Sequence, residues 1–283
     1  MNNTPLVTIV TVTYNPKKED LLKTLKSVLA QDFTNFEYLV QDGGSNNGTL
    51  EIVAEYEQAL KDKGITVQVV SGKDQGIYDA MNKAVSSATG TWVNFMNAGD
   101  CFYAENTLTS LFSQRDYEGI DIVYGDAVEC EYGHYYLFRK GFQEIEKRMP
   151  FSHQSAFARR ELLLDTPFDL RFPIGADYNF FLWNYRRGKQ FVDSGEKVCI
   201  VSKDGVSSVN LYDTFAEAIA IKSNNTVPIP SEKEQKKLLR ISSVKQFVMD
   251  YFPVFIKKAI RSYQIEKRGQ NAELTIPSWE KGC

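Results

Sequence analysis

The sequence predicts an α/β fold in which a mostly parallel central sheet is flanked by helices. Two observations support this prediction. Apolar, β-branched segments alternate with amphipathic helical segments over the first hundred residues, and four of the expected strands are followed by loops rich in small and acidic residues. Strands that alternate with helices form parallel sheets with right-handed crossovers, so these four loops should converge on one edge of the sheet.

The elements follow in order along the chain. The first strand is expected in 6–15, LVTIVTVTYN, which is apolar almost throughout, as in a strand covered on both faces. Leucine and valine at helical spacing then predict a helix at 18–31. The alternation continues with strands at 36–42, 66–71, 91–96 and 121–128 and helices at 49–62, 77–88 and 173–188.

Length and composition are those of an ordinary globular protein. The chain has 283 residues, of which 43% are hydrophobic and 24% charged. No apolar stretch approaches the length of a membrane span, and MNNTPLVTIV lacks the features of a secretory signal, so we expect a cytoplasmic protein. The four cysteines form no CxxC pair, so neither a zinc site nor a disulfide framework is indicated, and we expect reduced thiols.

Charge is unevenly distributed. Residues 231–270 contain ten Lys or Arg and four acids, a local charge of +6, whereas the whole chain carries −3. Apolar residues at helical spacing accompany these cations, which predicts a basic amphipathic helical element. It could bind an anionic membrane surface or pack on its own domain. Nucleic-acid binding is not favoured, because the rest of the chain is acidic. The final residues, 269–283, are typical of a loose tail.

The loops after the first four strands read TYNP, DGGSNNG, SGKDQG and NAGDC, and three of them supply an acid, Asp42, Asp74 or Asp100. One carboxylate at a turn usually caps a helix, but three on one rim favour a binding role. No GxxxxGK[ST] or GxGxxG motif follows the first strand, which argues against direct phosphate binding by a glycine-rich loop. Carboxylates can instead hold a divalent cation that binds a diphosphate.

Together, VTIVTVTYN, the DGGS turn, DQGIYDAMNKAV and NFMNAGDCF resemble the inverting glycosyltransferases of family 2, which have the GT-A nucleotide-sugar fold. The resemblance covers roughly residues 5–215 and is strongest to bacterial enzymes that assemble surface polysaccharides. It implies a nucleotide diphosphate sugar as donor, with UDP favoured, and a lipid-linked saccharide or polysaccharide as acceptor.

The resemblance also implies roles for individual residues. Contacts with the nucleotide sugar are expected from Thr11, Tyr14, Asn15, Asp42, Lys73, Asp74, Asp79, Asn82 and Asn97. Asp100 occupies the last position of the DxD-type motif, whose carboxylate binds Mn or Mg at the diphosphate. Asn97 and Gly99 stand where that motif often has acids, and Gln41 replaces one acid of the uridine-type turn. The cation site thus keeps one charged ligand.

Inverting transfer needs a general base on the acceptor side. Asp177, in PIGADYNFFLWNYRRG, resembles the second acid of the family's ED-type motif, with Ala176 at the first position. A helix-capping role for Asp177 stays open, and Asp165 and Asp169 are alternative bases. Candidates for contacts with the acceptor or the diphosphate, each with an equally plausible structural role, are Asp126, His153, Arg159, Arg160 and Trp183.

These expectations divide the chain into a catalytic domain, 1–225, and a basic helical extension, 226–283. The nucleotide-sugar half of the catalytic domain would end near residue 102, with the acceptor half at 103–225. Two other functions remain open. A scaffold that binds sugar nucleotides without turnover would account for the reduced metal motif. A nucleotidyltransferase could use a similar sheet, but the basic phosphate loop is missing.

Overall fold

The computed structural model describes residues 4–131, 133–138, 141–202, 210–251, 274 and 276–280. The elements up to residue 112 are β1 (Val7–Thr13), α1 (Lys18–Leu29), β2 (Phe36–Asp42), α2 (Thr49–Asp62), β3 (Thr66–Ser71), α3 (Ile77–Ser87), β4 (Trp92–Phe95), β5 (Cys101–Phe102) and α4 (Thr107–Phe112). Those that follow are β6 (Ile122–Glu131), β7 (His134–Phe138), η1 (Phe142–Glu144), η2 (His153–Ser155), β8 (Ala156–Arg159), α5 (Arg160–Asp165), α6 (Ala176–Arg186), β9 (Phe191–Ser202), α8 (Leu211–Asn224) and α9 (Glu232–Tyr251).

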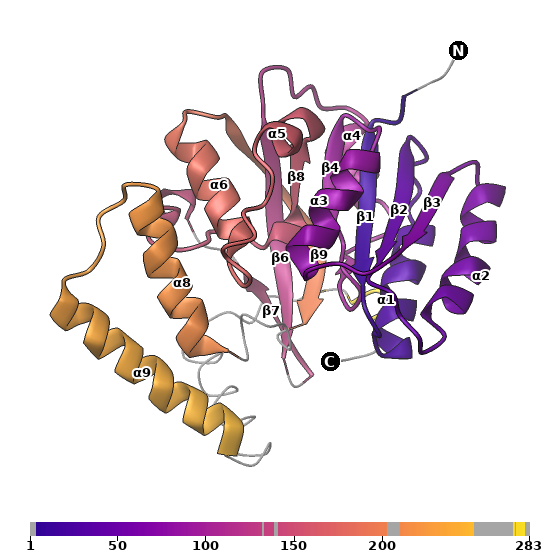
Figure 1. Cartoon of the computed structure of the whole chain (residues 1–283). Helices are drawn as coiled ribbons and strands as arrows, with labels where there is room; N and C mark the ends of the chain where they lie inside the picture. The colour runs from indigo at the N-terminus through magenta and orange to yellow at the C-terminus, as the bar shows by residue number, and fades with distance from the viewer. Residues whose placement is uncertain are drawn as a thin grey trace.

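The described strands form one mixed, mostly parallel sheet. Their order is β3-β2-β1-β4-β8-β6-β9-β5, with β7 paired to β6. The first four strands of the sequence, β1 to β4, are parallel to one another, and β8 runs antiparallel between β4 and β6. Figure 1 shows helices on both sides of this sheet. The predicted α/β fold with a mostly parallel sheet is therefore confirmed.

Two hydrophobic layers hold the helices to the sheet. Every residue of β1 and β2 is buried, as the unbroken apolar pattern predicts. On one face, Leu21, Leu25 and Val28 of α1 pack with no exposed surface, and each such side chain contributes about 1.5–3 kcal/mol through burial. The other face packs against α3 and α6. The loops at the strand ends are thus held by a rigid core.

The helix α8 packs against the core beside α6, and α9 packs against α8. Ile221 of α8 is buried against this core, and Glu217 accepts hydrogen bonds from the backbone of Ile174 and Gly175, just before α6. In Figure 1, α9 lies beside α8 and projects away from the body. No helix among the described residues is long and apolar enough to span a membrane.

Two expectations for this part of the chain are wrong. The described end of the expected loose tail is ordered, since Trp279 and Glu280 are buried. Cys101 and Cys199 are free thiols, as expected, but Cys130 is disulfide-bonded. The remaining cysteine, Cys283, lies outside the described residues, as do residues 252–270 of the basic segment.

Candidate active site

Unpaired polar atoms gather where β1, β2 and β4 end. The register pairs Thr13 with Asp42 at the ends of β1 and β2, and the backbone of Ala98, after β4, bonds to that of Val12. Three buried atoms at this edge have no hydrogen-bond partner among the described residues: Thr13 Oγ1, Asp42 Oδ1 and Asn97 Oδ1. The other four such atoms are scattered over β4, α5, α6 and the end of α8. Each costs about 1–3 kcal/mol unless a ligand or water satisfies it, so this edge is a candidate binding site.

Asp42 is held with one oxygen engaged and the other unpaired. Its Oδ2 accepts hydrogen bonds from the Ser71 hydroxyl at 2.5 Å, from Ser45 N at 2.9 Å and from Gly44 N at 3.1 Å. Burial alone would raise the pKa of Asp42, but these hydrogen bonds outweigh it and the pKa lies below its ordinary value. Asp42 is thus an ionised carboxylate whose Oδ1 is unpaired.

Tyr14, Asn15 and Asp74 surround the DGGS turn. A Cβ on Gly43 would lie 2.6 Å from Asp74 Oδ2 and 3.3 Å from the Tyr14 ring, so a larger residue there would displace the Asp74 carboxylate. Asn15 has a positive φ of 44°, and its Oδ1 accepts a hydrogen bond from Asn46 N at 2.9 Å. The Tyr14 side chain is 67% exposed, so its ring is accessible to a ligand at this rim.

The turn from Asn97 to Asp100 is fastened to α1. Thr24 Oγ1 lies 2.6 Å from Asp100 O and 3.1 Å from Asn97 O, and Gly99 N donates to it at 3.0 Å. Gly99 has a φ of +106°, which other residues rarely adopt. The glycine therefore allows the chain to turn back and present Asp100 at the strand ends.

Asp100 fits a divalent cation. Burial raises the pKa of its carboxyl group, although the hydrogen bond from Gln154 Nε2, at 2.7 Å, and the nearby charge of Lys23 oppose this shift. The described residues include no cluster of three or more His, Cys, Asp or Glu suited to a metal. The carboxylate of Asp100 and the unpaired amide oxygen of Asn97 are the hard donors that Mg and Mn prefer, which would leave other positions to diphosphate and water.

A chain of hydrogen bonds joins this turn to Asp177. Asn97 Nδ2 lies 3.1 Å from His153 Nε2, and His153 Nδ1 lies 3.0 Å from Asp177 Oδ2. Because the amide nitrogen of Asn97 is a donor, Nε2 accepts and Nδ1 carries the proton that His153 donates to Asp177. At the other oxygen, Asp177 Oδ1 accepts from the Tyr78 hydroxyl at 2.9 Å. Three predicted candidates and Tyr78, from four distant segments, thus form one network.

Asp177 is ionised in this network. It is the second residue of α6, and its Oδ1 also accepts from the backbone N of Tyr178 at 2.8 Å. Burial alone would raise its pKa, but the hydrogen bonds from His153, Tyr178 N and Tyr78 hold the pKa below its ordinary value. The helix-terminal role left open by the sequence is therefore present together with the contact to His153.

The loop between β3 and α3 is tied to its own helix. Asp79 Oδ2 accepts from Gln75 N at 2.9 Å and pairs with Lys83 Nζ at 2.8 Å, while Lys83 also donates to Lys73 O at 3.1 Å. The Lys73 side chain is exposed. Asn82 Nδ2 donates to Phe168 O, and Asn82 Oδ1 accepts from Phe168 N, each at 2.9 Å. These contacts give Asp79 and Asn82 structural partners.

Five other candidates make no hydrogen bond to Thr13, Asp42 or Asn97 among the described contacts. Thr11 is fully buried, with its hydroxyl bonded to Met96 O and Tyr38. Arg159 pairs in register with Trp92, at the opposite end of β4, and donates to the backbone oxygens of Ile120 and Tyr117. Arg160 is the first residue of α5, and Asp126 is buried opposite Lys197 of β9. Trp183 lies on the surface of α6 and is 37% exposed. The structure does not bring Arg159 to the site.

Thr13, whose Oγ1 is one of the unpaired atoms, had escaped the sequence analysis, as had three residues whose side chains contact the acids of the site. They are Tyr78, which contacts Asp177, Gln154, which contacts Asp100, and Ser71, which contacts Asp42. Gln154 follows His153 directly and could have been suspected from that neighbour. Tyr78 lies in the DQGIYDAMNKAV segment that carries the family resemblance, next to Asp79, and could have been suspected from that segment.

The chain belongs to glycosyl transferase family 2, whose family model matches residues 8–171. It is 34% identical over 182 residues to a PGL/p-HBAD biosynthesis glycosyltransferase of Mycobacterium tuberculosis, covering 62% of this chain and 68% of that protein. It is also 31% identical over 130 residues to glycosyltransferase AglE of Haloferax volcanii, covering 45% of this chain and 41% of that protein. The protein is therefore a nucleotide-sugar glycosyltransferase.

Solved structures agree on the fold. S. aureus TarS 1-349, in complex with UDP-GlcNAc, matches 82% of this chain and 70% of its own with a TM-score of 0.61 and 19% identity. Mannosyltransferase PcManGT from Pyrobaculum calidifontis, in complex with GDP-Man and Mn2+, matches 93% of this chain and 81% of its own with a TM-score of 0.59 and 19% identity. Both likenesses support the GT-A fold predicted for this chain.

Proposed function

We propose that this protein transfers a sugar with inversion from a nucleotide diphosphate sugar, with UDP favoured, to a hydroxyl of a lipid-linked saccharide or polysaccharide in bacterial surface-glycan synthesis. The observation that carries the proposal is the placement of unpaired buried atoms on Thr13, Asp42 and Asn97 at the edge that also holds the Asp100–Asp177 network. The proposed donor site and the proposed general base, Asp177, would thus lie at the same edge of the sheet.

The donor would lie along the strand ends. Asp42, ionised and with Oδ1 unpaired, is suited to accept a hydrogen bond from an N–H of the base. Tyr14, Asn15, Lys73 and Asp74 border the same turn and would contact the nucleotide. The relatives bind UDP-GlcNAc in one case and GDP-Man in the other, so GDP is the alternative base to test.

Asp177 is the proposed general base. As the acceptor oxygen bonds to the anomeric carbon, Asp177 takes its proton, and the bond to the diphosphate oxygen breaks on the opposite side of that carbon. His153 and Tyr78 hold the carboxylate in place and keep it ionised. A divalent cation, Mn or Mg, held by Asp100 with Asn97, would supply positive charge for the leaving diphosphate.

The same intact network separates this proposal from the scaffold alternative. A protein that only binds sugar nucleotides has no need for a buried, oriented carboxylate at Asp177. Slow donor hydrolysis without added acceptor would support turnover. Its absence, together with normal donor binding, would favour the scaffold. No described feature favours a nucleotidyltransferase.

Donor binding tests the proposal directly. The purified protein is titrated with UDP and with GDP by calorimetry, each with Mn and with chelator. We expect the wild type to bind UDP in a way that depends on Mn. We expect Asp100→Ala to lose this Mn-dependent binding. Binding of GDP alone would correct the base, and binding of neither nucleotide would overturn the donor site.

We further propose that α9, in the basic segment 231–270, brings the catalytic domain to the cytoplasmic face of an anionic membrane. On α9, Ile241, Val244, Phe247 and Tyr251 share one helical face and are 42%, 58%, 56% and 73% exposed. By helical spacing, Lys233, Lys237 and Arg240 lie on this face too, whereas Gln246, on the far side, bonds to Leu211 N of α8. Exposed apolar and cationic residues on one face suit an anionic lipid surface.

Vesicle binding tests this role of α9. The full chain is sedimented with vesicles of neutral lipid and of neutral lipid mixed with anionic lipid. Phe247→Glu should reduce binding to the anionic vesicles about tenfold, whereas Ser243→Glu, which adds the same charge on the flank of the same helix, should change it less than threefold. Equal losses in both variants would show that net charge, not this face, governs binding.

A further inference from the structure

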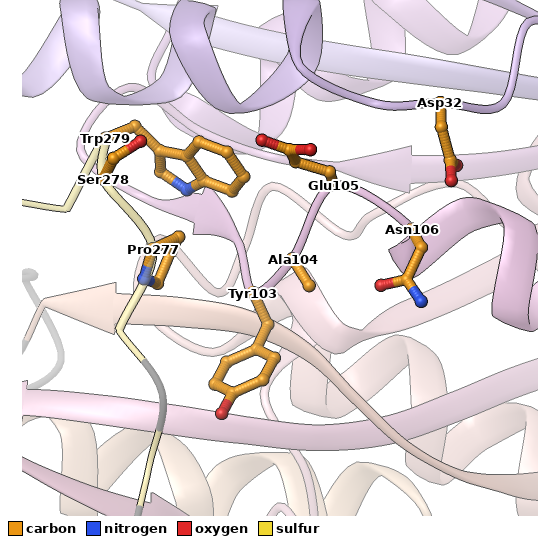
Figure 2. Close-up of a pocket in the computed structure, with 8 residues that line it drawn as sticks. All are labelled: Asp32, Tyr103, Ala104, Glu105, Asn106, Pro277, Ser278 and Trp279. Atoms are coloured by element: carbon orange, nitrogen blue, oxygen red, sulfur yellow. The ribbon is translucent and has the colours of Figure 1, made fainter.

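The C-terminal segment 276–280 packs against β5, the strand that follows the Asp100 turn. Trp279 is 9% exposed, and its Nε1 donates to Phe102 O, in β5, at 3.0 Å. Figure 2 shows Pro277, Ser278 and Trp279 beside the residues that follow β5, where the two segments line an open pocket of about 390 Å³. This segment comes from the end of the chain yet contacts the strand that begins one residue after Asp100.

Glu280 is completely enclosed at the end of this segment. Its side chain has no exposed surface and pairs with Lys23 Nζ at 3.1 Å. It also accepts from the Tyr135 hydroxyl at 3.2 Å and lies 3.6 Å from Cys101 Sγ. Burying the charges of Lys23 and Glu280 costs solvation free energy. Their ion pair and the hydrogen bonds from neighbouring groups must offset this cost. Glu280 therefore joins α1, β5 and β7.

Lys23 links Glu280 to the segment that holds the Asp100 turn. Its side chain is only 10% exposed and pairs with Glu280. The next residue of α1, Thr24, fastens the Asn97–Asp100 turn to this helix. The positive charge of Lys23 also lowers the pKa of Asp100, against the effect of burial.

Building on the proposed cation site, we propose that Glu280 is a positioning residue for Asp100. By holding Lys23 in an ion pair, with Trp279 anchoring the segment, Glu280 leaves the Asp100 carboxylate available to a divalent cation. The last residues of the chain would then belong functionally to the donor site. Without the charge of Glu280, Lys23 would compete with the cation for Asp100.

The test measures Mn affinity by calorimetry in the presence of UDP, on the full chain. Glu280→Gln keeps the shape of the side chain and removes its charge, and we expect Mn affinity to fall about tenfold, which corresponds to an opposite charge shifting a carboxyl group by about one pKa unit. UDP binding with chelator should stay the same. The double variant Lys23→Met with Glu280→Gln removes both charges and should restore Mn affinity to within about threefold.

Charge and packing are separated by Trp279→Phe, which removes the hydrogen bond to Phe102 but no charge. Mn affinity within about threefold of wild type supports the proposal, whereas a tenfold loss in this variant, or no recovery in the double variant, would show that packing alone matters. If Glu280→Gln does not fold, Lys23→Met is measured instead. It should bind Mn at least as tightly as wild type, and weaker binding would overturn the inference.

The wild type provides the remaining comparison. Mn-dependent UDP binding in the wild type, with no change in Glu280→Gln, refutes only the role of Glu280. Binding of UDP that ignores Mn in the wild type refutes the cation site itself, and the role of Glu280 falls with it.

Discussion

Asp177→Asn is the most informative single change, because it replaces the proposed base with a group of the same shape. The amide oxygen can still accept from the Tyr78 hydroxyl and from Tyr178 N, which lie 2.9 and 2.8 Å from Asp177 Oδ1. What is lost is the negative charge opposite His153 Nδ1, at 3.0 Å, and the ability to take a proton.

The expected size of the effect follows from these contacts. A general base contributes a factor of about 10² to 10⁴, so kcat should fall by that amount, or about 2.7 to 5.5 kcal/mol in the barrier. Donor affinity should stay within about threefold, since the described contacts of Asp177 include none with Asp42, Tyr14 or Asp74. Loss of the charged hydrogen bond with His153 should cost about 1.5 to 3 kcal/mol of folding stability.

The assay follows release of nucleoside diphosphate from the donor with a lipid-linked saccharide acceptor, and calorimetry measures donor binding. Asp169→Asn is the matched control, because Asp169 is the alternative base and pairs with Arg171 at 2.6 Å on the surface. This control should keep turnover within about threefold. Near-wild-type turnover in Asp177→Asn would refute the assignment, and loss of turnover only in Asp169→Asn would transfer the role to that residue.

The remaining predictions concern the groups around these two acids. Tyr78→Phe removes a donor to Asp177 and should lower both kcat, by about threefold to tenfold, and the unfolding free energy, by about 1 to 3 kcal/mol, as measured by turnover and by urea denaturation. Asp42→Asn should weaken UDP binding about tenfold or more in calorimetry while Mn is present, and unchanged affinity would remove Asp42 from base recognition. The pKa of Asp177 is lower in the fold than its ordinary value of 3.8, so its ionised form stabilises the protein above that pH, and this contribution is lost as the pH falls through the folded-state pKa. As the pH is lowered from about 5 to values below 3.8, the unfolding temperature should therefore fall less steeply in Asp177→Asn than in the wild type.

Local pattern was sufficient for the elements that carry the donor half. The bounds of β2, α2 and β3 coincide with the predicted ranges, because their apolar residues follow one period without interruption and glycine-rich or polar loops end them. The acids after these strands could be assigned to one rim by the same argument, since parallel strands end at the same edge. The sequence also supplied Asp100, His153 and Asp177 as candidates.

The second half depended on pairing that no local pattern reveals. The strand β9 was not predicted, because its first half carries exposed charged residues and its order comes from β6 and β5. Arg159 lies six residues after His153 and had been grouped with it. The intervening β8 runs antiparallel to β4, and at about 3.3 Å per residue it carries Arg159 toward the opposite edge.

The sequence by itself determined the fold class, the rim of the sheet and the residues with suitable chemistry. Only the tertiary structure decided which of them meet. Tyr78 and Asp177 are separated by 99 positions, and Lys23 and Glu280 come from opposite ends of the chain, yet each pair is in contact. Such contacts arise from packing of the folded core, which local periodicity does not encode.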